Sequence, residues 1–101
     1  MSEEKYLEVK LRQRVKDLKG WALKFHCVSF TGMPDRLILL PGGYLFFVEL
    51  KDRRGNLSPR QRLVHEQLRR MGFNPRVVNS QESLEELFLT FQICVNHEET
   101  I

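Results

Sequence analysis

An apolar hairpin with charged ends is the feature that most limits how this chain can fold. Two strand-like segments, 35–40 and 44–51, flank the turn Pro41-Gly42-Gly43. A connection this short between apolar segments predicts an antiparallel pair of strands. Segments this apolar also have to be covered, so the rest of the chain must supply helices that pack on a sheet.

The remaining segments predict those helices and two further strands. A helix is expected over residues 2–19, with Ser2 as its cap and Gly20 as its end. Alternation in residues 24–30 predicts a first strand, and residues 75–78 predict a short last strand. The order α-β-β-β-α-β-α predicts an α/β fold with a mixed central sheet flanked by helices. At 101 residues the chain has the length of one domain, 1–101.

The two later helices are recognised by their first residues. Ser58 followed by Pro59 predicts a helix start, and Ser83 with Glu86 matches a capping box. Apolar spacing predicts the buried side of each helix. These residues are Leu63, Val64, Leu68 and Met71 in the first, and Leu84, Leu87, Phe88, Phe91 and Val95 in the second.

Composition is that of a globular protein with a weak preference for an anionic partner. Hydrophobic residues make up 42% and charged residues 29%, and the net charge of +3 gives an isoelectric point near 9.1. Cys27 and Cys94 lack metal or redox spacing, so we expect reduced, buried thiols. The charged N-terminus is unlike a signal peptide and no apolar run approaches a membrane span, so a soluble cytoplasmic protein without membrane contact is expected.

The ends of the hairpin carry a candidate catalytic cluster. Glu49 and Lys51 are two residues apart, so they point to the same face of their strand. Antiparallel pairing brings Asp35, at the start of the other strand, to the same end of the hairpin. Two carboxylates held close together repel each other unless a proton or a cation separates them, and carboxylate oxygens suit Mg²⁺ or Mn²⁺. A lysine beside such a site could offset charge on a phosphate.

Four further residues are candidates on weaker grounds. Glu8 and Gln61 lie at the borders of apolar helix stripes, where a polar group needs a partner. Arg53 and Arg54 follow Lys51 and are candidates for DNA phosphate contacts, with a solvated basic loop as the alternative. Glu8 or Gln61 alone is more often a solvated side chain than a functional one, and the case for them depends on the combination with Asp35, Glu49 and Lys51. The three histidines, which show no ligand spacing, are expected to be surface or filler residues: His26, His65 and His97.

These motifs resemble the PD-(D/E)xK nuclease superfamily, with Pro34-Asp35 and Glu49-Leu50-Lys51 as the signature. More narrowly, the chain is similar to the small stand-alone virus-type replication-repair nucleases (VRR-NUC) of phages and bacteria. The similarity extends from Glu8 to the last helix, and it implies a restriction-endonuclease-like domain. It also implies roles for individual residues. Glu8, Asp35, Glu49 and the Leu50 carbonyl would be metal ligands, Lys51 the catalytic lysine and Gln61 a supporting residue of the catalytic site.

The resemblance implies a Mg²⁺-dependent DNA endonuclease in which Mn²⁺ could substitute. Members of this kind resemble Holliday-junction resolvases, which implies branched DNA as substrate, a homodimer and a role in replication or repair in a bacterial or phage-infected cell. The alternatives are a non-catalytic nucleic-acid binding module and an accessory subunit of a repair complex. A dimer also has a candidate surface, because Leu89 and Ile93 form a second apolar side on the last helix. The alternative is that both residues pack beneath the first helix of the same chain.

Overall fold

The computed structural model describes residues 1–100, with side chains up to His97, and Ile101 of the predicted domain lies outside the described residues. Its elements follow the predicted order α-β-β-β-α-β-α, so this part of the prediction is confirmed. They are α1 (Glu3–Asp17), β1 (Trp21–Lys24), β2 (Arg36–Leu40), β3 (Tyr44–Leu50), α2 (Pro59–Arg70), β4 (Arg76–Val78) and α3 (Gln81–Thr100).

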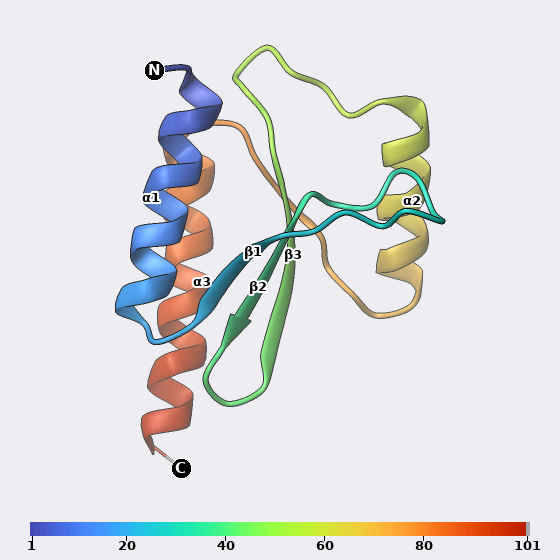
Figure 1. The fold of residues 1–101 in the computed structure, drawn as a ribbon. Helices are drawn as coiled ribbons and strands as arrows, with labels where there is room; N and C mark the ends of the chain where they lie inside the picture. Colours follow the sequence, from blue (N-terminus) through green and yellow to red (C-terminus); the bar gives the residue numbers. More distant parts are fainter. Residues whose placement is uncertain (101) are drawn as a thin grey trace.

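The strands form one mixed sheet in the order β1-β2-β3-β4. Strands β1, β2 and β3 are antiparallel neighbours, and β4 pairs with β3 in parallel. Figure 1 shows α1 and α3 side by side on one face of this sheet and α2 on the opposite side. The predicted mixed sheet flanked by helices is therefore confirmed.

The core lies between the sheet and the α1/α3 layer. Alternate residues of the hairpin, such as Ile38 and Val48, point into it and are 0% exposed. The helices contribute Leu11 of α1 and Phe91 of α3, which are also 0% exposed. Because one sheet face supplies this core, the other face is left for α2 and for the functional residues.

The end of α1 differs from the prediction in a physically informative way. The helix ends at Asp17, and Lys19 takes the left-handed conformation with φ 67°. The backbone N–H of Gly20 donates to the Val15 carbonyl at 2.9 Å, which completes a Schellman motif. A side chain at Gly20 would collide with the Leu39 carbonyl oxygen of β2, so Gly20 permits close approach of helix and sheet.

The first strand lies earlier than predicted. It runs over Trp21–Lys24, and its pairing with β2 continues only to the Phe25 N–H, which donates to the Asp35 carbonyl at 2.8 Å. Residues 26–30 form no strand. The alternation in this segment misled the prediction because β2 begins at Arg36 and offers no pairing partner beyond that point.

Two details of the helices also correct the sequence analysis. Helix α3 begins at Gln81, and Ser80 rather than Ser83 caps it through reciprocal hydrogen bonds between the two serines at 3.1 Å. Leu63 and Met71 are exposed because α2 packs through a narrow side around Val64 and Leu68. Two further findings concern other predicted side chains. Cys27 and Cys94 are unpaired but only partly buried. Leu89 and Ile93 are 67% and 69% exposed, so they do not pack beneath α1.

Candidate active site

The open end of the hairpin brings Asp35 and Glu49 together. Arg36 pairs with Val48 in the β2–β3 register, so the next position places Asp35 opposite Glu49. The backbone N–H of Leu50 donates to Asp35 Oδ1 at 3.2 Å, which fixes this carboxylate against the end of β3. The local cause is the apolar hairpin, whose register is set by its short turn and its buried face.

The Glu49 carboxylate is buried, and one of its two oxygens lacks a hydrogen-bond partner among the described residues. It is 3% exposed, and its Oε1 atom accepts no hydrogen bond from any of the described residues. Burial, followed by the charge of Asp35, raises the pKa of Glu49 to about 7, although Lys51 acts in the opposite direction. A carboxylate in this environment needs a proton or a cation.

Lys51 lies next to this pair. Its Nζ atom is 4.0 Å from Glu49 Oε2, and its side chain is 24% exposed. Its backbone N–H donates to the Val78 carbonyl at 3.0 Å, which extends the pairing of β3 with β4 past Leu50. The ammonium group is therefore held by an ordered backbone while it stays accessible to a ligand in solvent.

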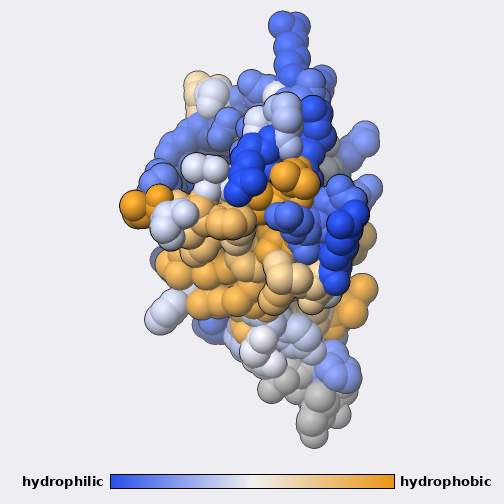
Figure 2. Space-filling model, turned by 90° about the vertical axis from the view of Figure 1, so that its right-hand side faces the viewer, coloured by the Kyte–Doolittle hydropathy of each residue, from blue (hydrophilic) through white to orange (hydrophobic). Residues whose placement is uncertain are grey.

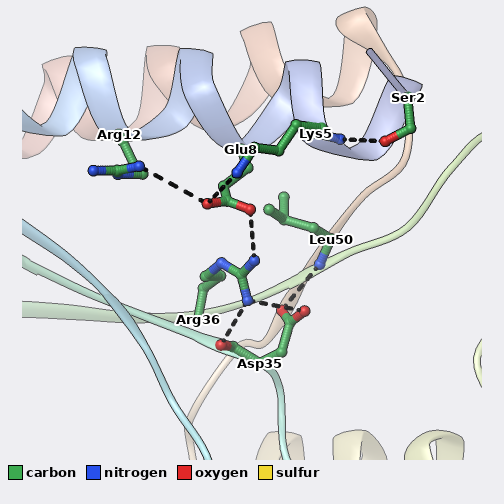
Figure 3. Close-up of polar contacts among 7 residues, drawn as sticks. All are labelled: Ser2, Lys5, Glu8, Arg12, Asp35, Arg36 and Leu50. Carbon is green, nitrogen blue, oxygen red and sulfur yellow. Dashed lines mark hydrogen bonds and ion pairs between the residues drawn. The ribbon is translucent and has the colours of Figure 1, made fainter.

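Glu8 lies on α1 outside the Asp35/Glu49 pair, and its carboxylate forms an ion pair with Arg36. Its Oε2 atom accepts a hydrogen bond from Arg36 Nη2 at 3.0 Å, and Arg36 Nη1 lies 3.2 Å from Asp35 Oδ2. Figure 3 shows the Arg36 guanidinium between Glu8 of α1 and Asp35. Burial alone would raise the pKa of Glu8, but the hydrogen bond and charge of Arg36 outweigh burial and lower it.

Arg36 was not recognised in the sequence analysis, although its position gave a signal. It follows Asp35 directly, so its side chain emerges on the sheet face that packs against α1, where an arginine requires a carboxylate. The structure thus joins Glu8 to Asp35 through Arg36 and does not bring Glu8 into the Asp35/Glu49 pair. A role of Glu8 as a metal ligand stays a prediction, and it would require Glu8 to leave Arg36.

Helix α2 contributes Gln61, whose side chain has a structural task. Gln61 Oε1 accepts a hydrogen bond from the Ser58 N–H at 2.9 Å, and the Gln61 N–H donates to Ser58 Oγ at 3.1 Å. These bonds form the capping box that begins α2. Any role of Gln61 in catalysis stays a prediction.

His65 lies one turn after Gln61, and its position decides between the surface role and the filler role expected for it. It is 0% exposed, and neither ring nitrogen has a hydrogen-bond partner within the part of the chain that the structure describes. Burial, followed by the charges of Arg69 and Lys51, lowers the pKa of His65, so the imidazole is neutral at pH 7. The expected filler role fits this environment, whereas a surface position does not.

The loop after Lys51 carries charges of both signs. Arg53 Nε lies 3.8 Å from Glu3 Oε1, and the Arg54 N–H donates to Asp52 Oδ1 at 2.9 Å. These residues and the start of α1 line a shallow groove. The two arginines are exposed near the site, and their contact with DNA stays a prediction.

The donor set at the hairpin end fits a hard cation. The partnerless Glu49 Oε1 and the repulsion between Glu49 and Asp35 are what a divalent cation would relieve. Asp35, Glu49 and the Leu50 carbonyl would hold it. Within the described part of the chain, no three His, Cys, Asp or Glu side chains gather to bind a metal, which agrees with the engagement of Glu8 by Arg36.

Known proteins resemble this chain in sequence and in fold. The chain is 36% identical over 76 residues to "Putative nuclease p44" of Acyrthosiphon pisum secondary endosymbiont phage 1, covering 75% of this chain and 82% of that protein. A solved structure described as a VRR_NUC domain superposes with a TM-score of 0.79 at 32% identity, covering 86% of this chain and 95% of the other. This chain belongs to the virus-type replication-repair nuclease family. No family model matches it.

Membership of the VRR-NUC family confirms the resemblance and the restriction-endonuclease-like architecture inferred from the hairpin motifs. The match is to a family of nucleases. Among the described residues, no helix is both long enough and apolar enough to cross a bilayer.

Proposed function

We propose that this VRR-NUC protein is a metal-dependent endodeoxyribonuclease that hydrolyses phosphodiester bonds. One observation carries the proposal: a buried Glu49 carboxylate opposite Asp35, with no hydrogen-bond partner at Oε1 among the described residues and with the Lys51 ammonium beside Oε2. A structural carboxylate pair in this position would have no reason to stay unneutralised. A site that binds a cation and a phosphate explains all three residues.

The chemistry can be assigned to individual groups. A bound Mg²⁺, or Mn²⁺ in its place, would supply a water made nucleophilic near neutral pH and would offset charge on the phosphate. Lys51 places a fixed positive charge where negative charge develops in the transition state. The Leu50 N–H and Arg36 orient the Asp35 carboxylate from two sides. Burial removes competing water from Glu49.

The finer parts of the proposal concern the substrate and the assembly. We propose branched DNA of the Holliday-junction kind as the substrate, cut by a homodimer during replication or repair in the cytoplasm of a bacterial or phage-infected cell. The phage origin of the relative is consistent with this setting. A two-fold dimer would present two hairpin sites to a junction that has matching symmetry. Arg53 and Arg54, exposed beside the site, are proposed to contact the DNA backbone, and Gln61 to support the site from α2.

A cleavage assay with the isolated protein tests the proposal. Labelled four-way junctions, flaps, linear duplex and single strands are incubated with Mg²⁺, Mn²⁺, Ca²⁺ or EDTA. We expect cleavage with Mg²⁺ and Mn²⁺ that EDTA abolishes, and loss of at least 100-fold in rate for Asp35→Asn, because removal of one such electrostatic group costs about that much. Asp17→Asn, an exposed aspartate at the far end of α1, is the matched control and should keep wild-type activity.

Two results would contradict the proposal. Undiminished cleavage by Asp35→Asn would show that the site lies elsewhere. Tight junction binding without cleavage under any metal condition would favour the non-catalytic module or the accessory subunit.

A further inference from the structure

Strand β1 is an edge of the sheet, and its outer side faces a groove beside α1. The strand order β1-β2-β3-β4 gives β1 one strand neighbour among the described residues, and Figure 1 shows α1 next to it. The groove between the two elements has a volume of about 480 Å³. One wall is α1, with Arg12, Gln13 and Lys16, and the other wall is β1 with residues 21–23.

The backbone of β1 has hydrogen-bonding groups that β2 does not use. The Phe25 N–H donates to the Asp35 carbonyl at 2.8 Å, so these two residues form a hydrogen-bonded pair of the antiparallel ladder. Such pairs alternate with pairs whose N–H and C=O groups point away from the partner strand. In the β1–β2 register the groups of Ala22 and Lys24 therefore point outward, to the free edge. A free edge of this kind can pair with another extended chain.

The α1 side of the groove is basic. Figure 3 shows Lys5, Glu8 and Arg12 on the side of α1 that faces Arg36, and a second hollow of about 370 Å³ extends the groove past them. Glu8 is the one carboxylate among the described residues of these walls, and its closest partner is Arg36 at 3.0 Å. The walls of the two hollows hold five basic side chains, which are Lys5, Arg12, Lys16, Lys24 and Arg36. The groove therefore keeps an excess of positive charge.

The other side of the same strand is apolar. Ala22 packs against the core, so its neighbours Trp21 and Leu23 point to the opposite side of the sheet, away from α1. Trp21 is 64% exposed and Leu23 41%. Figure 2 views the side of the molecule opposite α1 and α3 and shows a hydrophobic area bordered by hydrophilic residues. A chain that pairs with β1 therefore meets cations on one side and apolar side chains on the other.

We propose that the groove between α1 and β1 docks an extended segment of a partner protein in which acidic and apolar residues alternate. The segment adds as a strand to the free edge of β1, so its successive side chains point to opposite sides. Its acidic side chains meet the cations of α1 and Lys24, which lies opposite Arg36 in the register and shares its α1 side. Its apolar side chains extend the surface of Trp21 and Leu23. In strand addition, main-chain hydrogen bonds supply affinity and alternate side chains supply specificity.

The edge fits a polypeptide better than a strand of DNA. An extended polypeptide presents donors and acceptors at the spacing of the β1 backbone, about 3.3 Å per residue. A phosphodiester backbone carries acceptors alone, so it offers nothing to the outward carbonyls of Ala22 and Lys24. Charge complementarity alone would serve both ligands, and the free edge decides between them.

This docking site is separate from the proposed chemistry. Among the described residues, the walls of the groove include Arg36 but neither Glu49 nor Lys51. A docked segment therefore leaves the hairpin end open to DNA and holds the nuclease next to the partner protein. Loss of docking and loss of cleavage can then be measured independently.

Trp21 is the sole tryptophan, so its fluorescence reports on the edge of the groove. The probe is a synthetic peptide of alternating glutamate and valine, about six residues long, which is the usual length of a strand. We expect saturable binding with a blue shift of the Trp21 emission, because the valines remove water from the indole. No saturable binding up to about 1 mM, or binding without an emission shift, would overturn the proposal.

Two control peptides test the geometry of docking. One has the same composition with glutamates and valines in separate blocks, and the other is the alternating peptide with N-methyl groups in place of its amide hydrogens. Both should bind at least about 10-fold more weakly, since the first loses the alternation and the second loses main-chain hydrogen bonds. Equal binding of all three peptides would refute strand addition.

Charge-reversal variants locate the site. Lys16→Glu/Lys24→Glu should weaken binding of the alternating peptide by at least about 10-fold, because like charges across an interface repel each other. Lys10→Glu/Arg62→Glu makes the same change in net charge at exposed residues outside the groove and should bind like the wild type. An equal loss in both double variants would assign binding to overall charge and refute the site.

Circular dichroism checks the fold of these variants. If Lys16→Glu/Lys24→Glu is not folded, the wild type decides with a peptide that has lysine in place of glutamate. That peptide should not bind, and binding at the affinity of the glutamate peptide would contradict the charge argument.

Single-stranded DNA is the rival occupant and is tested with an oligothymidylate. Binding that shifts the Trp21 emission and is lost in Lys16→Glu/Lys24→Glu, without binding of the peptide, would assign the groove to nucleic acid and refute the proposal. Mg²⁺-dependent cleavage is measured for the same variant. Retained cleavage with loss of peptide binding supports a separate docking site, whereas loss of both would contradict the separation from the catalytic end.

Discussion

Replacing Glu49 by glutamine should stabilise the metal-free protein at alkaline pH. Glu49 is 3% exposed, faces the charge of Asp35 and has one oxygen without a partner. Ionised Glu49 therefore opposes folding when no cation is present. Glutamine has nearly the same shape and removes the charge.

The magnitude and the sign follow from the pKa. Unfolding returns the pKa of Glu49 from about 7 to 4.5. Between these values the unfolded chain releases a proton that the folded protein keeps, so stability falls as pH rises through this window and stays low above pH 7. At about 1.4 kcal/mol per pKa unit the full effect is about 3 kcal/mol, which water near the open end of the hairpin reduces to about 2 kcal/mol.

The assay is thermal and urea unfolding in EDTA at pH 5 and pH 8, for wild type, Glu49→Gln and the exposed control Glu86→Gln. On going from pH 5 to pH 8 the wild type should lose about 2 kcal/mol relative to Glu49→Gln, or roughly 8–16 °C in melting temperature. The cost of burying the glutamine amide does not depend on pH, so it cancels when the free energies of unfolding at pH 5 and pH 8 are subtracted for each protein. The wild type should recover stability at pH 8 when Mg²⁺ is added. Equal pH dependence of wild type and Glu49→Gln would refute the reasoning.

Three further predictions address Arg36, Lys51 and Gly20. Arg36→Gln leaves the buried Glu8 carboxylate without its main partner and should lower the free energy of unfolding in urea by about 3 kcal/mol. Arg12 is an exposed partner of Glu8 at 4.0 Å, so Arg12→Gln should cost less than about 1 kcal/mol. Equal costs for the two variants would show that burial of the ion pair does not add to its contribution. Lys51→Ala should lower the single-turnover cleavage rate by about 100-fold or more with a small change in DNA affinity, and a loss of affinity at unchanged rate would make Lys51 a phosphate anchor. Gly20→Ala should lower the free energy of unfolding by about 2 kcal/mol, because its methyl group meets the Leu39 carbonyl oxygen, and a wild-type melting temperature would contradict the close packing of α1 on β2.

The parts of the fold that the sequence predicted correctly are those with strong local signals. The short turn and the apolar runs located the hairpin, and Ser58 with Pro59 located the start of α2. The strand expected over 24–30 failed because alternation says nothing about a pairing partner, which β2 does not supply beyond Arg36. A local pattern cannot show where the neighbouring strand begins.

The candidate site was predictable to the same degree. Asp35, Glu49 and Lys51 belong to one hairpin, so register alone brought them together. Glu8 comes from another element, and its contact with Arg36 depends on how α1 packs on the sheet. Burial of His65 likewise depends on which side of α2 faces the rest of the protein, and the apolar spacing wrongly included Leu63 and Met71. The predictions that were correct depend on local register within the hairpin, and those that were missed depend on how distant elements pack together.

The most direct test of the account is the position of a bound metal. Crystals soaked in Mn²⁺ and measured at the manganese absorption edge would locate the ion by its anomalous signal. We expect the peak to place the ion in direct coordination to the carboxylates of Asp35 and Glu49 and to the Leu50 carbonyl. In crystals of Glu49→Gln the peak should be absent. A peak at other residues, or an unchanged peak in Glu49→Gln, would contradict the claim that the hairpin end is the metal site of this nuclease.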